Sequence, residues 1–204
     1  MKFIVSPSSR PARVFVMLLI MLSCAVGLVY AEGSAKYVGA EKCKNCHSSA
    51  KKGDQYGVWK KMKHALAYES LATDKAKESG KAKGVTDPQN DAKCLKCHVT
   101  AYSEPADKKD AKFDPKQGIQ CESCHGPGGN HVKARLAAAA SEEGGDAFGG
   151  GEAARIKLPA GEINASPDAK VCQGCHNTES PNYKEFKFED FKKLTAHPDP
   201  RKKP

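Results

Sequence analysis

The sequence predicts a mainly α-helical fold, built from short helices and long loops, with little or no β-structure. Residues 56–71 repeat their apolar side chains every four positions, which places them on one face of a helix. Residues 188–197 have a second apolar stripe, with a spacing of three positions, and His197 ends it. No segment shows the alternation of apolar and polar residues that is typical of a strand.

A connecting segment rich in Gly and Ala extends over residues 126–164. Within it, we expect a short helix at 136–140 and a flexible, surface-exposed loop at 144–151.

Four copies of Cys-x-x-Cys-His are the strongest functional signal in the chain. In this motif, two thiols can form thioether bonds to the vinyl groups of a haem, and the adjacent imidazole can bind the iron. The first cysteines are separated by 51, 27 and 51 residues, so the copies share a chemistry but no structural period. The predicted attachment sites are Cys43, Cys46 and His47; Cys94, Cys97 and His98; Cys121, Cys124 and His125; and Cys172, Cys175 and His176.

Two other uses of paired cysteines, a disulfide framework and zinc sites, compete with haem attachment. Histidine makes up only 7 of the 204 residues, yet one follows every Cys-x-x-Cys pair. Every cysteine after residue 31 lies in one of the four motifs, so none is left for a separate disulfide. We therefore expect the chain to bind four haem c groups, each with its iron.

These cofactors are expected to take the place of a side-chain core. Residues 32–204 provide only about 43 residues for each motif, and few of them are aliphatic. A chain of this size and composition cannot bury a large apolar core of its own. The prediction is one tetrahaem cytochrome c domain over 32–204, with short helices and long loops wrapped around four covalently bound haems.

The first 31 residues have the features of a secretory signal peptide. Three cations and no acid precede an apolar run over 14–30, and Ala31 ends an A-x-A-like site. We expect cleavage after Ala31, export to the periplasm, and no stable membrane insertion of the remaining chain. Because the run is as long as the shortest membrane spans, an uncleaved membrane anchor stays open, as do lipid attachment at Cys24 and an extracellular location.

The charge of the chain argues against nucleic acid as a partner. The formal net charge is +9, and removal of residues 1–31 would leave +6. The propionates of the haems would offset this charge, the lysines are scattered, and no nucleic-acid motif accompanies them. Lysine-rich areas such as 75–83 are either sites that steer acidic redox partner proteins or simply solvated helix faces.

Counting axial ligands predicts one open iron. Four irons have eight axial positions, whereas the chain has seven histidines, four of them in the motifs. The other three, His64, His131 and His197, are the candidate second ligands. Met62 lies about 200° around the same helix from His64 and is expected to pack elsewhere. One haem is therefore expected to be five-coordinate, or to take water, a lysine or another weak donor, and the count leaves open which one.

Three segments resemble the tetrahaem cytochrome c-554 family. They are Trp59…His64-Ala65…Glu69-Ser70-Leu71; Cys121-Glu122-Ser123-Cys124-His125-Gly126-Pro127-Gly128, which His131 follows; and Phe186-Lys187-Phe188, which leads to His197. The Gly-rich stretch after His131 and the short tail after His197 depart from the family pattern. These departures affect the expected partner surface more than the expected haem core.

The resemblance implies crossed ligation, in which a histidine of one segment binds the iron of another. The implied pairs are His47 with His131, His125 with His64, and His176 with His197. His98 would be the single ligand of a high-spin iron. This arrangement agrees with the shortage of one ligand that the count of histidines indicates.

The leading functional hypothesis is electron transport between redox partner proteins. A bis-histidine iron keeps both axial bonds in its ferric and ferrous forms, so electron transfer needs little reorganisation. No set of acid–base side chains stands out, so no catalytic residue is predicted. The alternative is a reductase of a small molecule (nitric oxide, another nitrogen oxide or peroxide) at the His98 iron. Tyr102, Glu104 and Lys96 are candidate proton donors by sequence proximity alone. A sensing or filament-forming role is the third hypothesis.

Overall fold

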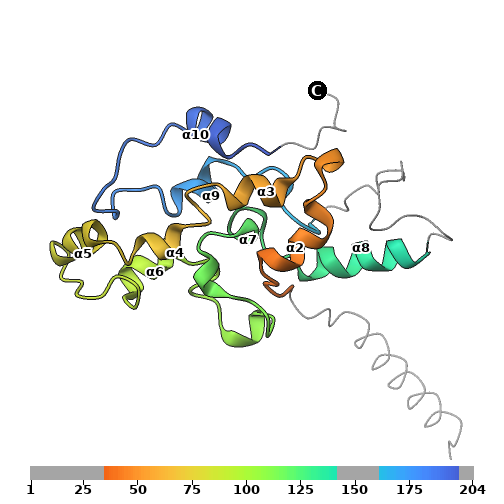
Figure 1. Ribbon diagram of the computed structural model, residues 1–204, viewed down its shortest axis with the longest axis horizontal. Helices are drawn as coiled ribbons and strands as arrows, with labels where there is room; N and C mark the ends of the chain where they lie inside the picture. Colours follow the sequence, from red (N-terminus) through yellow and green to blue (C-terminus); the bar gives the residue numbers. More distant parts are fainter. Residues whose placement is uncertain (1–34, 142–160, 198–204) are drawn as a thin grey trace, which may run out of the picture. The chain divides into compact units, whose positions relative to one another are not determined.

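The computed structural model describes residues 35–141 and 161–197, which form short helices joined by loops (Figure 1). The α-helices are α2 (Ala40–His47), α3 (Gln55–Lys60), α4 (Ala67–Ser70), α5 (Asp74–Lys81), α6 (Ala92–His98), α7 (Cys121–His125), α8 (Gly129–Ser141), α9 (Ala169–Gln173) and α10 (Phe188–Thr195). Three 3-10 helices lie between them: η1 (Ala50–Lys52), η2 (Ala106–Lys108) and η3 (Pro115–Gln117). Within the described ranges, extended segments pair only at an isolated bridge between Tyr37 and Lys109. The predicted mainly α fold is confirmed.

Two expectations from the sequence fall on residues that the structure does not describe. The signal peptide over 1–31 and the exposed loop over 144–151 both lie outside the described ranges. Among the described helices, none is both long enough and apolar enough to cross a membrane.

The single helix expected over 56–71 is wrong, because the structure breaks it into two. α3 ends at Lys60, a series of turns follows, and α4 begins at Ala67. In the turns, the carbonyl oxygen of His64 accepts a hydrogen bond from Ile119 N (2.9 Å), in a loop distant along the chain. This tertiary hydrogen bond draws the backbone at His64 away from a continuous helix.

Two other helices differ from expectation at their ends. α8 includes the predicted segment 136–140 but begins at Gly129, so it also contains His131. α10 confirms the apolar stripe near the C-terminus, while His197 lies two residues beyond its last residue, Thr195. Helix boundaries are the part of a fold that local patterns define least well.

Three of the motifs end a short helix and the fourth lies at the end of one. α2, α6 and α7 finish at the histidines of motifs one, two and three, and α9 finishes within motif four. The helices α6 and α9 begin at aspartate caps: Asp91 accepts from Lys93 N (2.8 Å), and Asp168 accepts from Lys170 N (3.0 Å). Seven of the eight motif cysteines therefore lie on short helices, and Cys175 follows the end of α9.

The start of α2 is held by side chains from motif three and the residue before it. Ala40 N donates to Gln120 Oε1 (2.7 Å). The buried carboxylate of Glu122 accepts from Val38 N (2.9 Å), Gly39 N (2.8 Å) and Gly128 N (2.6 Å). These hydrogen bonds fix α2 against α7, which also contacts α9 and lies near the middle of Figure 1.

The side-chain core is small, as the composition predicts. Within the described residues, the buried hydrophobic side chains are Ala40, Trp59, Ala65, Leu71, Val85 and Val99. Trp59 packs with Ala40 and Ala65, and its Nε1 donates to Ile119 O (2.8 Å). The apolar burial that these residues provide is modest for a chain of this length.

Candidate haem-attachment site

A cavity of about 2580 Å³ lies between the described α-helices, and residues from all of them line it. All eight motif cysteines and all seven histidines of the chain line it. A pocket for one small molecule usually has a volume of roughly 300–1,000 Å³. The cavity is therefore large enough for several bulky groups, and its chemistry is that of thiols and imidazoles.

The eight motif cysteines line the cavity, and none of them forms a disulfide. All eight are free thiols and partly buried at the cavity wall. A haem that enters the cavity would meet a pair of thiols in each motif, beside a histidine. The donor set and the space both fit four haem c groups.

Contacts between cysteines of different motifs connect the four sites in a series. A hydrogen bond between the Cys43 and Cys121 thiols raises the pKa of Cys43 and joins motif one to motif three. Burial and the nearby Cys172 thiol raise the pKa of Cys124 to about 11. Motif three therefore lies next to motif four. Burial and the neighbouring Cys97 raise the pKa of Cys175 to about 12, which joins motif four to motif two. Contacts of α7 with α2 and with α9, and the ion pair of Lys96 with Glu179, give the same neighbours. The spatial order is thus one, three, four, two.

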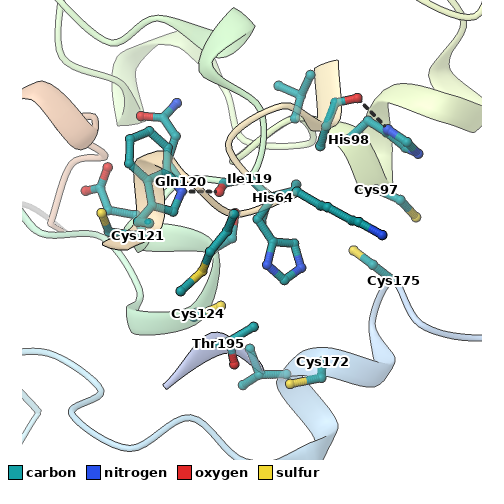
Figure 2. A pocket seen from close by; sticks show the side chains of 18 of the residues that line it. His64, Cys97, His98, Ile119, Gln120, Cys121, Cys124, Cys172, Cys175 and Thr195 are labelled. Carbon is teal, nitrogen blue, oxygen red and sulfur yellow. Dashed lines mark hydrogen bonds between the residues drawn. The ribbon is translucent and has the colours of Figure 1, made fainter. Parts of the chain in front are cut away.

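Six of the seven histidines face one another in three pairs across the cavity. The ring centroids are 6.2 Å apart for His47 and His131, 6.0 Å for His64 and His176, and 5.9 Å for His125 and His197. Figure 2 shows His64 projecting into the cavity among cysteines of motifs two, three and four.

These separations match two imidazoles on opposite sides of one metal ion. A metal–imidazole bond is about 2 Å long, and the centre of the ring lies roughly 1 Å behind the bonded nitrogen. Two such rings on either side of an iron would therefore have centroids about 6 Å apart. The residues present fit bis-histidine ligation at three positions.

Two of the three pairs differ from those that the family resemblance implies. His47 and His131 lie together as expected. However, the structure places His64 next to His176 and His125 next to His197. The ligand pairs that the resemblance implies, His125 with His64 and His176 with His197, stay predictions. The turns after α3 direct His64 toward the motif-four histidine, and the chain after α10 brings His197 to α7. Such placement depends on tertiary contacts, which a count of ligands does not contain.

His98 is the one histidine that remains after this pairing. Its Nδ1 lies 2.7 Å from Ala67 O, a contact between α6 and α4 that Figure 2 marks with a dashed line. Its Nε2 is therefore the nitrogen that can bind an iron. The histidine without a facing histidine ring is thus the one of motif two.

Hydrogen bonds at Nδ1 also orient three other rings. His125 Nδ1 lies 2.6 Å from Asn164 O, and His197 Nδ1 lies 2.7 Å from Thr195 O. His131 Nδ1 lies 2.6 Å from Glu162 Oε1. A partner at Nδ1 fixes the tautomer, so that Nε2 keeps its lone pair for a metal.

Burial keeps several of these imidazoles neutral. It is the main cause of a lowered pKa at His47, His64, His125 and His176. Because neutral imidazole is the form that binds iron, these rings are in the protonation state that ligation needs near pH 7.

The structure adds contacts that the sequence patterns did not identify. Phe186 stacks on His176 with a centroid distance of 5.0 Å, and Phe191 lies 5.9 Å from the same ring. Glu162 and Arg135 form a cluster with His131. The apolar spacing that predicts α10 contains Phe191, whereas no local pattern marks Glu162.

Comparisons with known proteins agree with the motifs. The family model described as cytochrome c554 and c-prime matches residues 42–126, which contain motifs one to three. Cytochrome c-554 of Nitrosomonas europaea is 35% identical over 100 residues, which cover 47% of this chain and 40% of that protein. The chain thus spans less than half the length of this relative, and no solved structure matches it significantly.

The matched region contains three attachment motifs, His64 and the helices that position them. The fourth motif, His131 and His197 lie beyond it. Over residues 42–126, the chain is similar to the cytochrome c554 and c-prime family.

Proposed function

We propose that this chain is a periplasmic c-type cytochrome that carries electrons through four haem c groups. The observation that supports this most is the set of three histidine pairs, about 6 Å apart, in one cavity that all eight motif cysteines line. When bound, each haem supplies an iron that gains and loses one electron.

The protein residues provide attachment and orientation. The motif cysteines would tether each group covalently, and the paired histidines would hold three of the irons from both sides. Hydrogen bonds at Nδ1 restrict the rotation of His125, His131 and His197. Rings held in this way move little when the charge at the metal changes, which favours rapid electron transfer.

The spatial order of the motifs supports a carrier with two ends. Motifs three and four are internal to the series, while motifs one and two are terminal. A redox partner protein at each end would need to approach only one attachment site. We propose that the partners are redox proteins and that the lysine-rich surfaces help to steer those with acidic patches.

We further propose that residues 1–31 are removed as a signal peptide. Covalent haem attachment on the outer side of a bacterial inner membrane requires export, and the charge and hydropathy of this segment fit that route. The alternatives of an uncleaved anchor or an extracellular location would give a different N-terminus or a different cell fraction.

A second candidate function rests on His98. Because its ring is not part of a histidine pair, an iron at motif two could take a small gaseous ligand or peroxide and reduce it. This activity would require that the site opposite His98 be accessible as well as vacant.

The test is a haem and ligand count on the exported protein. Intact mass should show a chain that begins at Glu32 with four haems attached. Carbon monoxide added to the reduced protein should bind at one haem of the four. Fewer than four haems would contradict the carrier as proposed. Turnover of nitric oxide or peroxide at steady state would favour the reductase instead.

A further inference from the structure

Glu162 joins His131 and Arg135 in a compact cluster at the edge of the cavity. Glu162 Oε1 lies 2.6 Å from His131 Nδ1, and its Oε2 accepts from Arg135 Nη2 (2.6 Å). Arg135 Nε also donates to Oε1 (3.1 Å), so the guanidinium holds the carboxylate at both oxygens. The side chain of Glu162 is only 6% exposed.

The cluster is built by the geometry of α8. His131 and Arg135 are four residues apart on this helix and therefore share one face. The guanidinium of Arg135 pairs with both oxygens of Glu162 and holds that side chain as a carboxylate. The carboxylate is thus an anion, fixed from two directions, with one oxygen directed at the imidazole.

Glu162 differs in charge from the acceptors at the other histidines. His98, His125 and His197 place Nδ1 against the backbone carbonyls of Ala67, Asn164 and Thr195. A carbonyl is neutral, whereas a carboxylate draws the Nδ1 proton toward itself and makes Nε2 a stronger electron donor. A stronger donor stabilises ferric over ferrous iron and so lowers the reduction potential.

We propose that Glu162 is a positioning residue that orients His131 and lowers the reduction potential of the iron shared by His47 and His131. Arg135 limits this effect, because its charge withdraws part of the negative charge from the carboxylate. This inference rests on the proposed function, since it requires that the two histidines bind one haem. It makes motif one, at one end of the series, more reducing than its ligands alone would make it.

Glu162→Gln tests the charge while it preserves the size of the side chain and an oxygen acceptor. Spectroelectrochemical titration should show one haem shifted to a higher potential, with the low-spin count unchanged. Glu78→Gln removes the same charge from the exposed face of α5 and is the matched control, which should leave all four potentials in place.

Arg135→Gln supplies a second arm with the opposite sign. It removes the counter-charge and leaves Glu162 beside His131, so the same haem should shift to a lower potential. If the potential shifts in the same direction in both variants, the cause is general damage to α8, and the proposal is overturned. Unchanged potentials in both fully loaded variants would overturn it as well.

His131→Ala separates this inference from the proposed function. If this variant turns one low-spin haem high-spin, the ligand assignment holds, and the two variants above decide the role of Glu162 alone. If its spin states are unchanged, His131 is not a ligand, and both the assignment and the inference fail.

Discussion

The carboxylate of Glu122 shows how a single residue within an attachment motif can organise the chain around it. It is 3% exposed and accepts hydrogen bonds from the backbone at Val38, Gly39 and Gly128. These donors come from both sides of motif three, so one side chain fixes the start of α2 and the turn before α8. The position between the two cysteines of the motif thus has a structural role of its own.

Replacement of Glu122 by alanine should destabilise the loaded protein by about 2–4 kcal/mol, since each buried donor left unpaired costs roughly 1–3 kcal/mol. Unfolding in urea, followed by circular dichroism, would measure the change. Glu78→Ala is the control, because that side chain is exposed on α5. A loss no larger than that of the control would show that water satisfies the freed N–H groups.

The histidine pairing makes a prediction that a double substitution can decide. If His64 and His176 share one iron, the variant with both changed to alanine should lose one low-spin signal in electron paramagnetic resonance. If His64 instead pairs with His125, and His176 with His197, the same variant should lose two. The matched double substitution of His125 and His197 should likewise affect one iron.

At the scale of elements, the loop before α7 is pressed against the turns that contain His64. Gly118 has a φ of +71°, and a Cβ there would lie 2.7 Å from His64 O and 3.0 Å from Ala65 O. The next residue, Ile119, donates to the same His64 carbonyl and accepts from Trp59. The position of His64 therefore depends on a glycine that is distant in the sequence.

Gly118→Ala should destabilise the protein by about 2–4 kcal/mol and weaken ligation by His64. Gly84→Ala is a close control, since its φ is also positive (+69°) but no atom lies within 4 Å of the added Cβ. The control should cost only the backbone strain, about 1–2 kcal/mol. Equal losses in the two variants would mean that the contact with His64 relaxes without effect.

At the scale of the whole molecule, the features that could be predicted are those that depend on residues close together in the sequence. The attachment residues follow from the motif itself, and the mainly α fold follows from apolar spacing and from the lack of strand patterns. The break between α3 and α4 could not be predicted, because it depends on the hydrogen bond between Ile119 N and His64 O. The histidine pairs and Glu162 likewise depend on which distant segments meet.

The cavity predicts that the chain without haem does not hold its fold. Few hydrophobic side chains are buried in the described part of the chain, and a space of about 2580 Å³ would be left for water. Protein made without the attachment machinery should therefore show little helical circular dichroism and rapid backbone hydrogen exchange. The loaded protein is the control, and native-like protection of the unloaded chain would contradict this prediction.

The pairing of the histidines also constrains how the protein is assembled. An exported chain emerges from its N-terminal side, so motif one would receive its haem well before His131 becomes available. The haem at motif three would likewise wait until His197 has crossed and can reach it. Newly attached irons would therefore pass through a coordinatively open, chemically reactive period. Biogenesis of such a chain calls for protection of these intermediates until the partner histidines arrive.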